Sequence, residues 1–280
     1  YTDGYLTITP ITDTVTVTIV GNHDSKVYTG EEQKVEGYSY SAKAGTATIA
    51  NGEFTVALKD GKEAIAKGTN ADTYYMGLTK DDFTVTSKNY SNITVEYTDG
   101  YLTITPITSK VTVTITENSD EVTYDGQNHT IKGYKSIESD NTLYDVTKLV
   151  KETETDAWTV TKKDAGTYDM SIVATDFANL DKTNFPNVEF KVVDGQLKIN
   201  PISSKVTVTI TENSDEATYD GENHTISGYK SIESDNPLYV VADSVSETKT
   251  DAWTVTEKDD GTYDMGILAA DFENKNKNFT

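Results

Sequence analysis

The chain of 280 residues carries 46 Asp and Glu against 24 Lys, has no Arg, and bears a net charge of −22. So acidic a surface repels phosphate backbones and anionic lipid, which argues against a nucleic-acid or membrane partner. The chain has no Cys, which excludes disulfides and thiolate chemistry, and no apolar run approaches the length of a membrane span.

The chain is built from an internal repeat. The decapeptide YTDGYLTITP at Tyr1–Pro10 returns letter for letter at Tyr97–Pro106, and a diverged copy, VVDGQLKINP, occupies Val192–Pro201. Self-similarity at a fixed period indicates repeated structural units. We therefore expect these parts: a closing strand of a preceding repeat (1–10), repeat 1 (11–106), repeat 2 (107–201) and repeat 3 (202–280), which lacks its closing hairpin.

Each repeat opens with an alternating segment, VTVTI, at 15–19, 111–115 and 206–210. Period-two alternation predicts a half-buried strand, with the β-branched threonines on the outer face. A turn with an aligned glycine follows, and then a variable middle in which Asn51-Gly52 and Asp60-Gly61 predict hairpin turns. No stretch predicts a convincing helix, and the only helical hints are short, at Thr147–Glu152 and Asp176–Lys182.

The second half of each repeat predicts a strand, a corner and another strand. A loop of the form Asn-aromatic-x-Asn follows at Asn89–Asn92 and Asn184–Asn187. The repeat then closes with an expected hairpin, which turns at Asp99-Gly100 in repeat 1 and at Asp194-Gly195 in repeat 2. About seven short strands with frequent turn signals predict an all-β fold of tandem Ig-like β-sandwich domains, arranged end to end as a rod.

One local motif sharpens this expectation. The stretch Asp164–Met170, DAGTYDM, resembles the D-x-G-x-Y-x-C corner of immunoglobulin domains, with Met in place of Cys. In that fold the Tyr hydroxyl bonds to nearby backbone. Two tryptophans on the strand before the corner are expected to lie in the cores. The structural residues predicted in this way are Tyr74, Tyr168, Tyr263, Met76, Met170 and Met265 at the corners, and Trp158 and Trp253 in the cores.

The wider pattern runs VTVTI, [VT]Y-x-G, GTY-x-M, D-F, NF-x-NV and DG-x-L-x-I-x-P. It resembles the tandem Ig-like repeats, some called MBG-type, of large cell-surface proteins in Gram-positive, often gut-dwelling, bacteria. The resemblance covers all three repeats. It implies an extracellular adhesin or stalk, anchored to the cell wall through parts that are not in this segment.

The sequence offers no candidate catalytic site, because it shows no Ser/His/Asp set, Cys/His cluster or phosphate loop. We therefore expect no enzyme and no cofactor. His129 and His224 occupy one repeat position, where repeat 1 has Gln33, and we expect surface turn residues there. An isopeptide bond between Lys and Asn, which occurs in some surface Ig-like domains, cannot be paired from the sequence.

A Ca²⁺ site is the one metal hypothesis that the sequence raises. Clustered oxygen donors would suit weak binding of this ion beside the domain junctions. No D-x-D-x-D-G loop is present, however, and repeat 1 has GNHDS at the same place. The donors concerned are Glu117, Asp120, Glu212 and Asp215.

Two functions remain open. The first is a stalk that projects a distal binding region, because the next strand follows Pro10, Pro106 and Pro201 without a flexible Gly/Ser linker. The second is an adhesive module whose variable middle loops, which diverge most at Tyr40–Lys67, recognise a host glycan or protein. Exposed tyrosines could also form binding platforms, although we expect most to pack in strands, and Tyr101, which corresponds to Gln196, to lie at the surface.

Self-association is a further hypothesis. Tyr5–Pro10 of one molecule could pair with the incomplete repeat 3 of the next, as in donor-strand complementation, to give head-to-tail chains. The alternative is that the adjacent parts belong to a longer protein.

Overall fold

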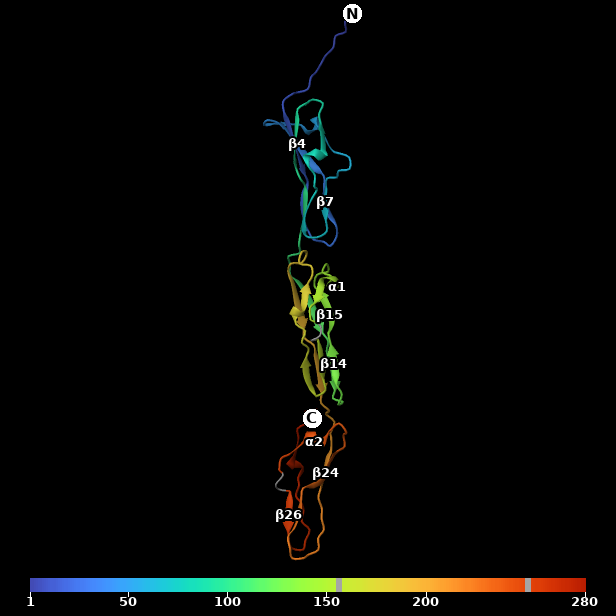
Figure 1. The fold of residues 1–280 in the computed structure, drawn as a ribbon, viewed down its shortest axis with the longest axis vertical. Helices are drawn as coiled ribbons and strands as arrows, with labels where there is room; N and C mark the ends of the chain where they lie inside the picture. The colour runs from blue at the N-terminus through green and yellow to red at the C-terminus, as the bar shows by residue number, and fades with distance from the viewer. Residues whose placement is uncertain (155–157, 250–252) are drawn as a thin grey trace. The chain divides into compact units, whose positions relative to one another are not determined.

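The computed structural model describes residues 1–154, 158–249 and 253–280. Ala157 and Ala252, which open two of the expected strands, lie outside the described residues. The described part is nearly all β, with two α-helices of four residues each, and is arranged in small sheets of the sandwich type (Figure 1). The expected all-β, sandwich-type fold class is confirmed.

The elements follow the three sequence repeats. Repeat 1 holds β1 (Val15–Gly21), β2 (His23–Val27), β3 (Gln33–Glu36), β4 (Tyr38–Ala44), β5 (Ala47–Ile49), η1 (Asn51–Glu53), β6 (Thr55–Leu58), β7 (Ile65–Gly68), β8 (Asp72–Tyr75), η2 (Lys80–Asp82), β9 (Phe83–Thr86), β10 (Ile93–Thr98) and β11 (Tyr101–Thr105). Repeat 2 holds β12 (Val111–Glu117), β13 (Asp120–Thr123), β14 (His129–Lys132), β15 (Tyr134–Ser139), α1 (Val146–Leu149), β16 (Val150–Glu152), β17 (Thr159–Lys162), β18 (Gly166–Asp169), η3 (Ala174–Asp176), β19 (Phe177–Asn179), β20 (Val188–Val193) and β21 (Gln196–Asn200). Repeat 3 holds β22 (Val208–Glu212), β23 (His224–Ser227), β24 (Tyr229–Ser234), α2 (Val241–Ser244), β25 (Val245–Glu247), β26 (Thr254–Glu257), η4 (Ala269–Asp271) and β27 (Phe272–Asn274).

The described chain forms two compact units that do not coincide with the repeats. Unit 1 comprises Tyr1–Thr114, Glu138–Thr153 and Phe177–Lys191. Unit 2 comprises Ile115–Ile137, Glu154–Asp176 and Val192–Thr280. Each unit therefore contains a junction between two sequence repeats. The expectation that each repeat is a domain by itself stays a prediction.

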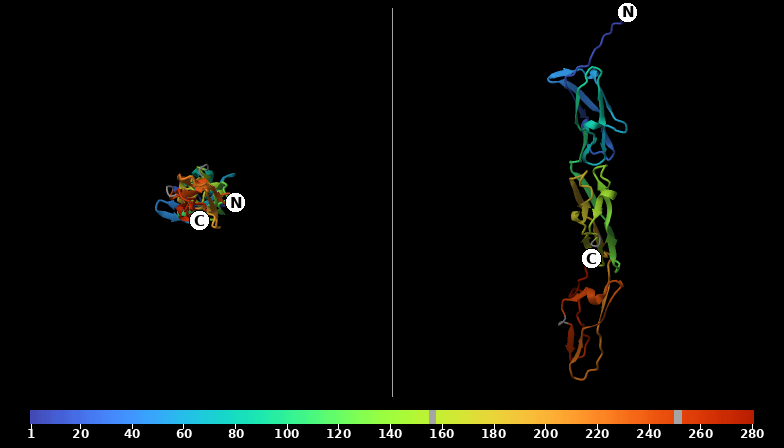
Figure 2. Two further views of the ribbon diagram at one scale, coloured as in Figure 1. Left: turned by 90° about the horizontal axis from the view of Figure 1, so that it is seen from below. Right: turned by 45° about the horizontal axis from the view of Figure 1, so that its top comes forward.

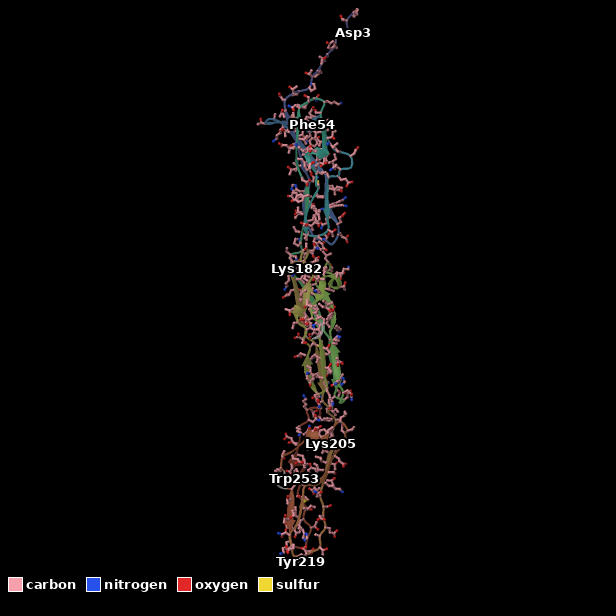
Figure 3. The ribbon with its side chains drawn as sticks, in the orientation of Figure 1. Asp3, Phe54, Lys182, Lys205, Tyr219 and Trp253 are labelled. Atoms are coloured by element: carbon pink, nitrogen blue, oxygen red, sulfur yellow. The ribbon has the colours of Figure 1, made fainter. Side chains whose placement is uncertain are left out.

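The core of repeat 1 follows from its alternating strands. Val15, Val17 and Ile19 of β1 are completely buried, while the threonines between them are only partly so. β1 lies in the four-stranded sheet β10-β1-β4-β5 and faces Phe54 and Phe83 in one apolar cluster. Figure 3 places Phe54 within the body of this repeat. The period-two pattern thus directs every second side chain of β1 into the core.

The expected closing hairpin of repeats 1 and 2 is wrong. β10 pairs parallel with β1, whereas β11 pairs parallel with β2 and antiparallel with β8, in a different sheet. The chain bends at Asp99-Gly100 to pass from one sheet to the other. Gly100 serves close approach, because a Cβ there would lie 2.5 Å from the carbonyl oxygen of Asn22. In repeat 2, β20 and β21 likewise lie in separate sheets, on either side of Asp194-Gly195.

The two hairpins expected in the middle of repeat 1 are also absent from the described structure. Asn51-Gly52 opens the 3₁₀ turn η1, which separates β5, paired with β4, from β6, paired with β9. Asp60-Gly61 does form a tight turn, with φ of 79° at Gly61, but the next strand, β7, pairs with β3 instead of β6. Both dipeptides therefore change the direction of the chain between sheets.

Repeat 3 has fewer paired strands than repeat 2. β22 and β24 form a two-stranded sheet, whereas their counterparts β12 and β15 are joined by β20. Residues 215–218 form no strand, although their counterpart β13 pairs with β21 in repeat 2. At the other end of the chain, residues 1–10 form no strand, and they leave repeat 1 as a single unpaired trace (Figure 2).

Candidate functional site: the junctions between repeats

The predicted corner tyrosines hold the backbone at the end of each repeat. The hydroxyls of Tyr74, Tyr168 and Tyr263 donate to the carbonyl oxygens four residues earlier, over 3.0, 2.9 and 3.2 Å. Neither Tyr168 nor Tyr263 is largely buried: Tyr168 is half-buried and Tyr263 is 43% exposed. The Tyr74 ring also packs against the buried cluster of Ala66, Leu102 and Ile104, and the ammonium of Lys162 lies 5.3 Å from the centre of the Tyr168 ring.

The remaining predicted structural residues lie as follows. Trp158 and Trp253 are each 4% exposed, and their indole N–H groups donate to the carboxylates of Asp176 and Asp271. Met170 and Met265 are buried, at 8% and 7% exposure, whereas Met76 is partly buried and contacts two apolar clusters of repeat 1. In repeats 2 and 3, each tryptophan therefore lies in the core and supplies a hydrogen bond to a buried carboxylate.

In unit 1, the corner of repeat 1 receives an asparagine from repeat 2. The carboxamide oxygen of Asn184 accepts a hydrogen bond from the backbone N–H of Ala71 at 2.7 Å. Its amide nitrogen donates to Oδ1 of Asn70 at 3.1 Å and to Oδ2 of Asp181 at 2.9 Å. Asn184 is only 4% exposed, so these bonds satisfy a buried amide that would otherwise destabilise the junction.

An aromatic side chain completes the same junction. Phe185, next to the junction asparagine, is fully buried. Its ring meets Tyr28 of repeat 1 edge to face, with centroids 5.5 Å apart, and Tyr144 of repeat 2 at 5.1 Å. Burial, and then the negative charge of Asp181, raise the pKa of Tyr28 and bring the pKa of Tyr144 to about 12. Both hydroxyls therefore stay protonated at neutral pH.

Unit 2 repeats this arrangement at the next junction. The carboxamide oxygen of Asn278 accepts from the backbone N–H of Ala165 at 2.6 Å, and its amide donates to Oδ1 of Asp164 at 3.1 Å. Phe279 meets Tyr124 edge to face at 5.9 Å. Because the same two contacts recur at equivalent positions, they are a property of the repeat.

The corner tyrosines and the junction asparagines act on the same residues. Tyr74 bonds to the carbonyl of Asn70, whose side chain receives Asn184, and Tyr168 bonds to the carbonyl of Asp164, whose side chain receives Asn278. We use the name junction lock for an asparagine and the aromatic residue after it, together with the corner of the preceding repeat that they contact. The sequence showed the Asn-aromatic pair in all three repeats, at 89–90, 184–185 and 278–279, but its role was missed.

The acidic residues proposed as Ca²⁺ ligands accept hydrogen bonds from backbone N–H groups. Both carboxylate oxygens of Glu117 accept backbone N–H groups, from Ile172 at 2.9 Å and Gly195 at 2.6 Å, and the side chain is 4% exposed. Glu212 accepts from Ile267 at 3.0 Å. Asp120 and Asp215 each cap the following residue, as the acceptors of the N–H groups of Glu121 and Glu216. Among the described residues, no group of three His, Cys, Asp or Glu is placed to hold a metal ion.

The three histidines lie on strand ends at the surface. His129 and His224 contact Asp125 and Asp220, at 2.9 and 3.1 Å, within their own turns. His23 is exposed on β2, where its ring stacks on Tyr101. None of them lies at a junction lock.

Repeat 3 carries two open grooves. The first, of about 370 Å³, is lined by Val206, which precedes β22, by Val208 and Ile210 of β22, and by Phe272 and Phe279. The second, of about 680 Å³, runs between residues 212–219 and 257–265, the segments whose counterparts in repeat 2 flank β21. Tyr219, at the loop end of this groove, is 65% exposed (Figure 3).

The family model of the MBG domain matches residues 111–201, which is nearly all of repeat 2. MBG domains are β-rich modules found in surface proteins, and this part of the chain is similar to them. No curated protein and no solved structure matches the chain. In the described residues, no helix has the length and apolar character needed to cross a bilayer.

Proposed function

We propose that the chain is a non-enzymatic stalk segment of an extracellular adhesin, anchored to the wall of a Gram-positive cell, and that it carries a distal binding region away from that cell. The junction lock is the observation that supports this function. A flexible chain of domains needs solvated linkers between them. Here Asn184 and Asn278 are buried at the corners of the preceding repeats, and their aromatic neighbours contact those repeats as well.

The similarity of repeat 2 to the MBG domain supports a place in a surface protein. The same sequence period runs through repeats 1 and 3, so each repeat adds one further unit of length to the stalk. Stalk residues need only fold and stay soluble, and a net charge of −22 favours solubility. This function requires no bound ion or cofactor.

Stiffness at the junction is the property to measure. The chain has no Cys, so cysteines introduced at Lys43 and Lys151, both exposed and on opposite sides of the first junction, would be the only labelling sites. Spin labels there should give a narrow distance distribution, which broadens when Asn184 is replaced by Ala. A distribution that is already broad in the parent chain, or small-angle scattering from a compact particle, would rule out the stalk.

The second function, adhesion through the variable middle loops, remains a hypothesis. Repeat 1 differs from repeat 2 in this region, where β5, η1 and β6 replace α1 and β16. A glycan array and a pull-down with host mucus proteins, both with the 280-residue chain, test it. Loss of binding when residues 46–63 are exchanged for the corresponding loop of repeat 2 would establish these loops as the contact surface.

A further inference from the structure

A row of three aromatic side chains crosses one exposed sheet face of repeat 1. The sheet β2-β11-β8 places Tyr101 of the central strand in register with His23 on one side and Tyr75 on the other. The rings of His23 and Tyr101 stack with centroids 5.3 Å apart, and those of Tyr101 and Tyr75 lie 6.0 Å apart. We name these three residues the aromatic row.

The aromatic row points away from the core. Tyr75 is 65% exposed, Tyr101 is 37% exposed and His23 is exposed, whereas Leu102 and Ile104, the alternate residues of β11, are buried. The inner face of the sheet therefore supplies the apolar packing. Contiguous exposed aromatic side chains on a soluble protein commonly mark an interaction site.

The fold does not require aromatic residues in this row. In repeat 2 the same positions hold Ser119, Gln196 and Asp169. Gln196 pairs with Asp169 in the ladder of β21 and β18, and its backbone N–H donates to the Ser119 hydroxyl at 3.2 Å. The same sheet thus forms with three polar side chains, and the aromatic row is a specific property of repeat 1.

The next row of the sheet consists of hydroxyl groups. Thr103 of β11 is in register with Ser25 and Thr73, and the hydroxyls of Thr73 and Thr103 lie 3.3 Å apart. The face therefore offers aromatic rings beside hydrogen-bonding hydroxyls, and these two rows contain no Asp, Glu or Lys. A pyranose sugar has the matching chemistry, because it presents C–H groups on its ring face and hydroxyls around its rim.

Two further observations separate a sugar from other partners. The chain carries a net charge of −22, which repels sialylated, sulfated or uronic-acid glycans and leaves neutral ones. The central strand β11 is paired on both edges, with β2 and β8. Its backbone N–H and C=O groups are therefore already bonded and cannot pair with a peptide that lies on this face. From this geometry we propose that the aromatic row of repeat 1 binds a neutral hexose oligosaccharide. The proposal is independent of the stalk function.

The chain supplies its own probe for the test. Of its three histidines, only His23 belongs to the row, while His129 and His224 lie in repeats 2 and 3. Titration of the chain with cellopentaose, and separately with lactose, should shift the imidazole proton resonances of His23 in NMR spectra and leave those of the other two histidines unmoved. The anionic 3′-sialyllactose should bind at least ten-fold more weakly than lactose.

The matched variant replaces the aromatic row with the side chains of repeat 2, as His23→Ser, Tyr101→Gln and Tyr75→Asp. Its affinity for the sugar, measured from the NMR signals of the glycan, should be at least ten-fold lower than that of the parent chain. A second variant, Tyr75→Phe, keeps the ring, and it should retain binding within a few-fold. The thermal midpoint of each variant shows that the sheet is intact. If neither neutral sugar moves His23 at millimolar concentration, or if the three-residue variant binds as well as the parent, the proposal is overturned.

Discussion

Replacement of Asn184 by Ala tests the junction lock most directly. The substitution removes the two cross-repeat hydrogen bonds, 2.7 Å from Ala71 and 3.1 Å to Asn70, and the bond to Asp181 within repeat 2. Each bond contributes about 0.5–1.5 kcal/mol, and the half-buried backbone N–H of Ala71 also loses its acceptor. We expect repeat 2 to lose about 2–4 kcal/mol of unfolding free energy.

The assay can report on repeat 2 by itself. With Trp253 replaced by Phe, Trp158 is the only tryptophan, and its fluorescence follows the unfolding of repeat 2 in urea. At a slope of about 2 kcal/mol per molar urea, which is the middle of the usual range, the expected loss moves the midpoint down by roughly 1–2 M.

The control is the same substitution at the equivalent position of repeat 1. Asn89 is exposed, and its amide donates to Glu53 within the same repeat. Asn89→Ala should therefore leave the midpoint of repeat 2 unchanged. Asn70→Ala changes repeat 1 but should lower the midpoint of repeat 2, by about the worth of one hydrogen bond. If Asn70→Ala has no effect on Trp158, the two repeats are not coupled and the reasoning fails.

Three further predictions concern the corner, the core and the open groove. Tyr168→Phe should destabilise repeat 2 by about 1 kcal/mol, the worth of one hydrogen bond, and no change in thermal unfolding would contradict the corner role. Trp158→Ala should lower the unfolding free energy of repeat 2 by about 3–5 kcal/mol, because it opens a cavity and removes the indole donor of Asp176. A loss below about 1 kcal/mol would contradict a core role for Trp158. Residues 1–10 have the same sequence as 97–106, which include β11, and β11 fills the place in repeat 1 that corresponds to the 680 Å³ groove of repeat 3. Light scattering should therefore show that the chain self-associates as its concentration rises, whereas a chain that starts at residue 11 should stay monomeric. Equal behaviour of the two chains would exclude head-to-tail pairing.

The alternating strands could be predicted from the sequence because their signal is local. Val111, Val113 and Ile115 are at most 1% exposed, as period two requires. The Asp-Gly bends were misread because a turn and a crossing between sheets share the same local chemistry. Asp99 accepts the backbone N–H of Gly77 at 2.9 Å, beside the pairing of β8 with β11, and no local pattern reveals that partner.

The junction lock could not be predicted from the sequence because its two halves are far apart along the chain. Asn184 and its partner Asn70 are 114 residues apart, and Asn278 and Asp164 are separated by the same distance along the chain. That separation exceeds the period of the repeat, so the contact joins different parts of successive repeats. An asparagine followed by an aromatic residue in every repeat was visible, but a loop signal alone does not tell which surface it will meet.

The parallel pairing of the first two strands of repeat 1 with its last two has a mechanical consequence. Six positions pair β1 with β10 and five pair β2 with β11, all in parallel register. The chain enters repeat 1 at the beginning of β1 and leaves it at the end of β11, so tension on the two ends pulls these paired strands past each other lengthwise. The ladder is then loaded in shear, with all its hydrogen bonds sharing the force at once, whereas a hairpin pulled at its open end yields one bond at a time. A repeat with this connectivity resists extension along the chain, which is the property that the proposed stalk function would need.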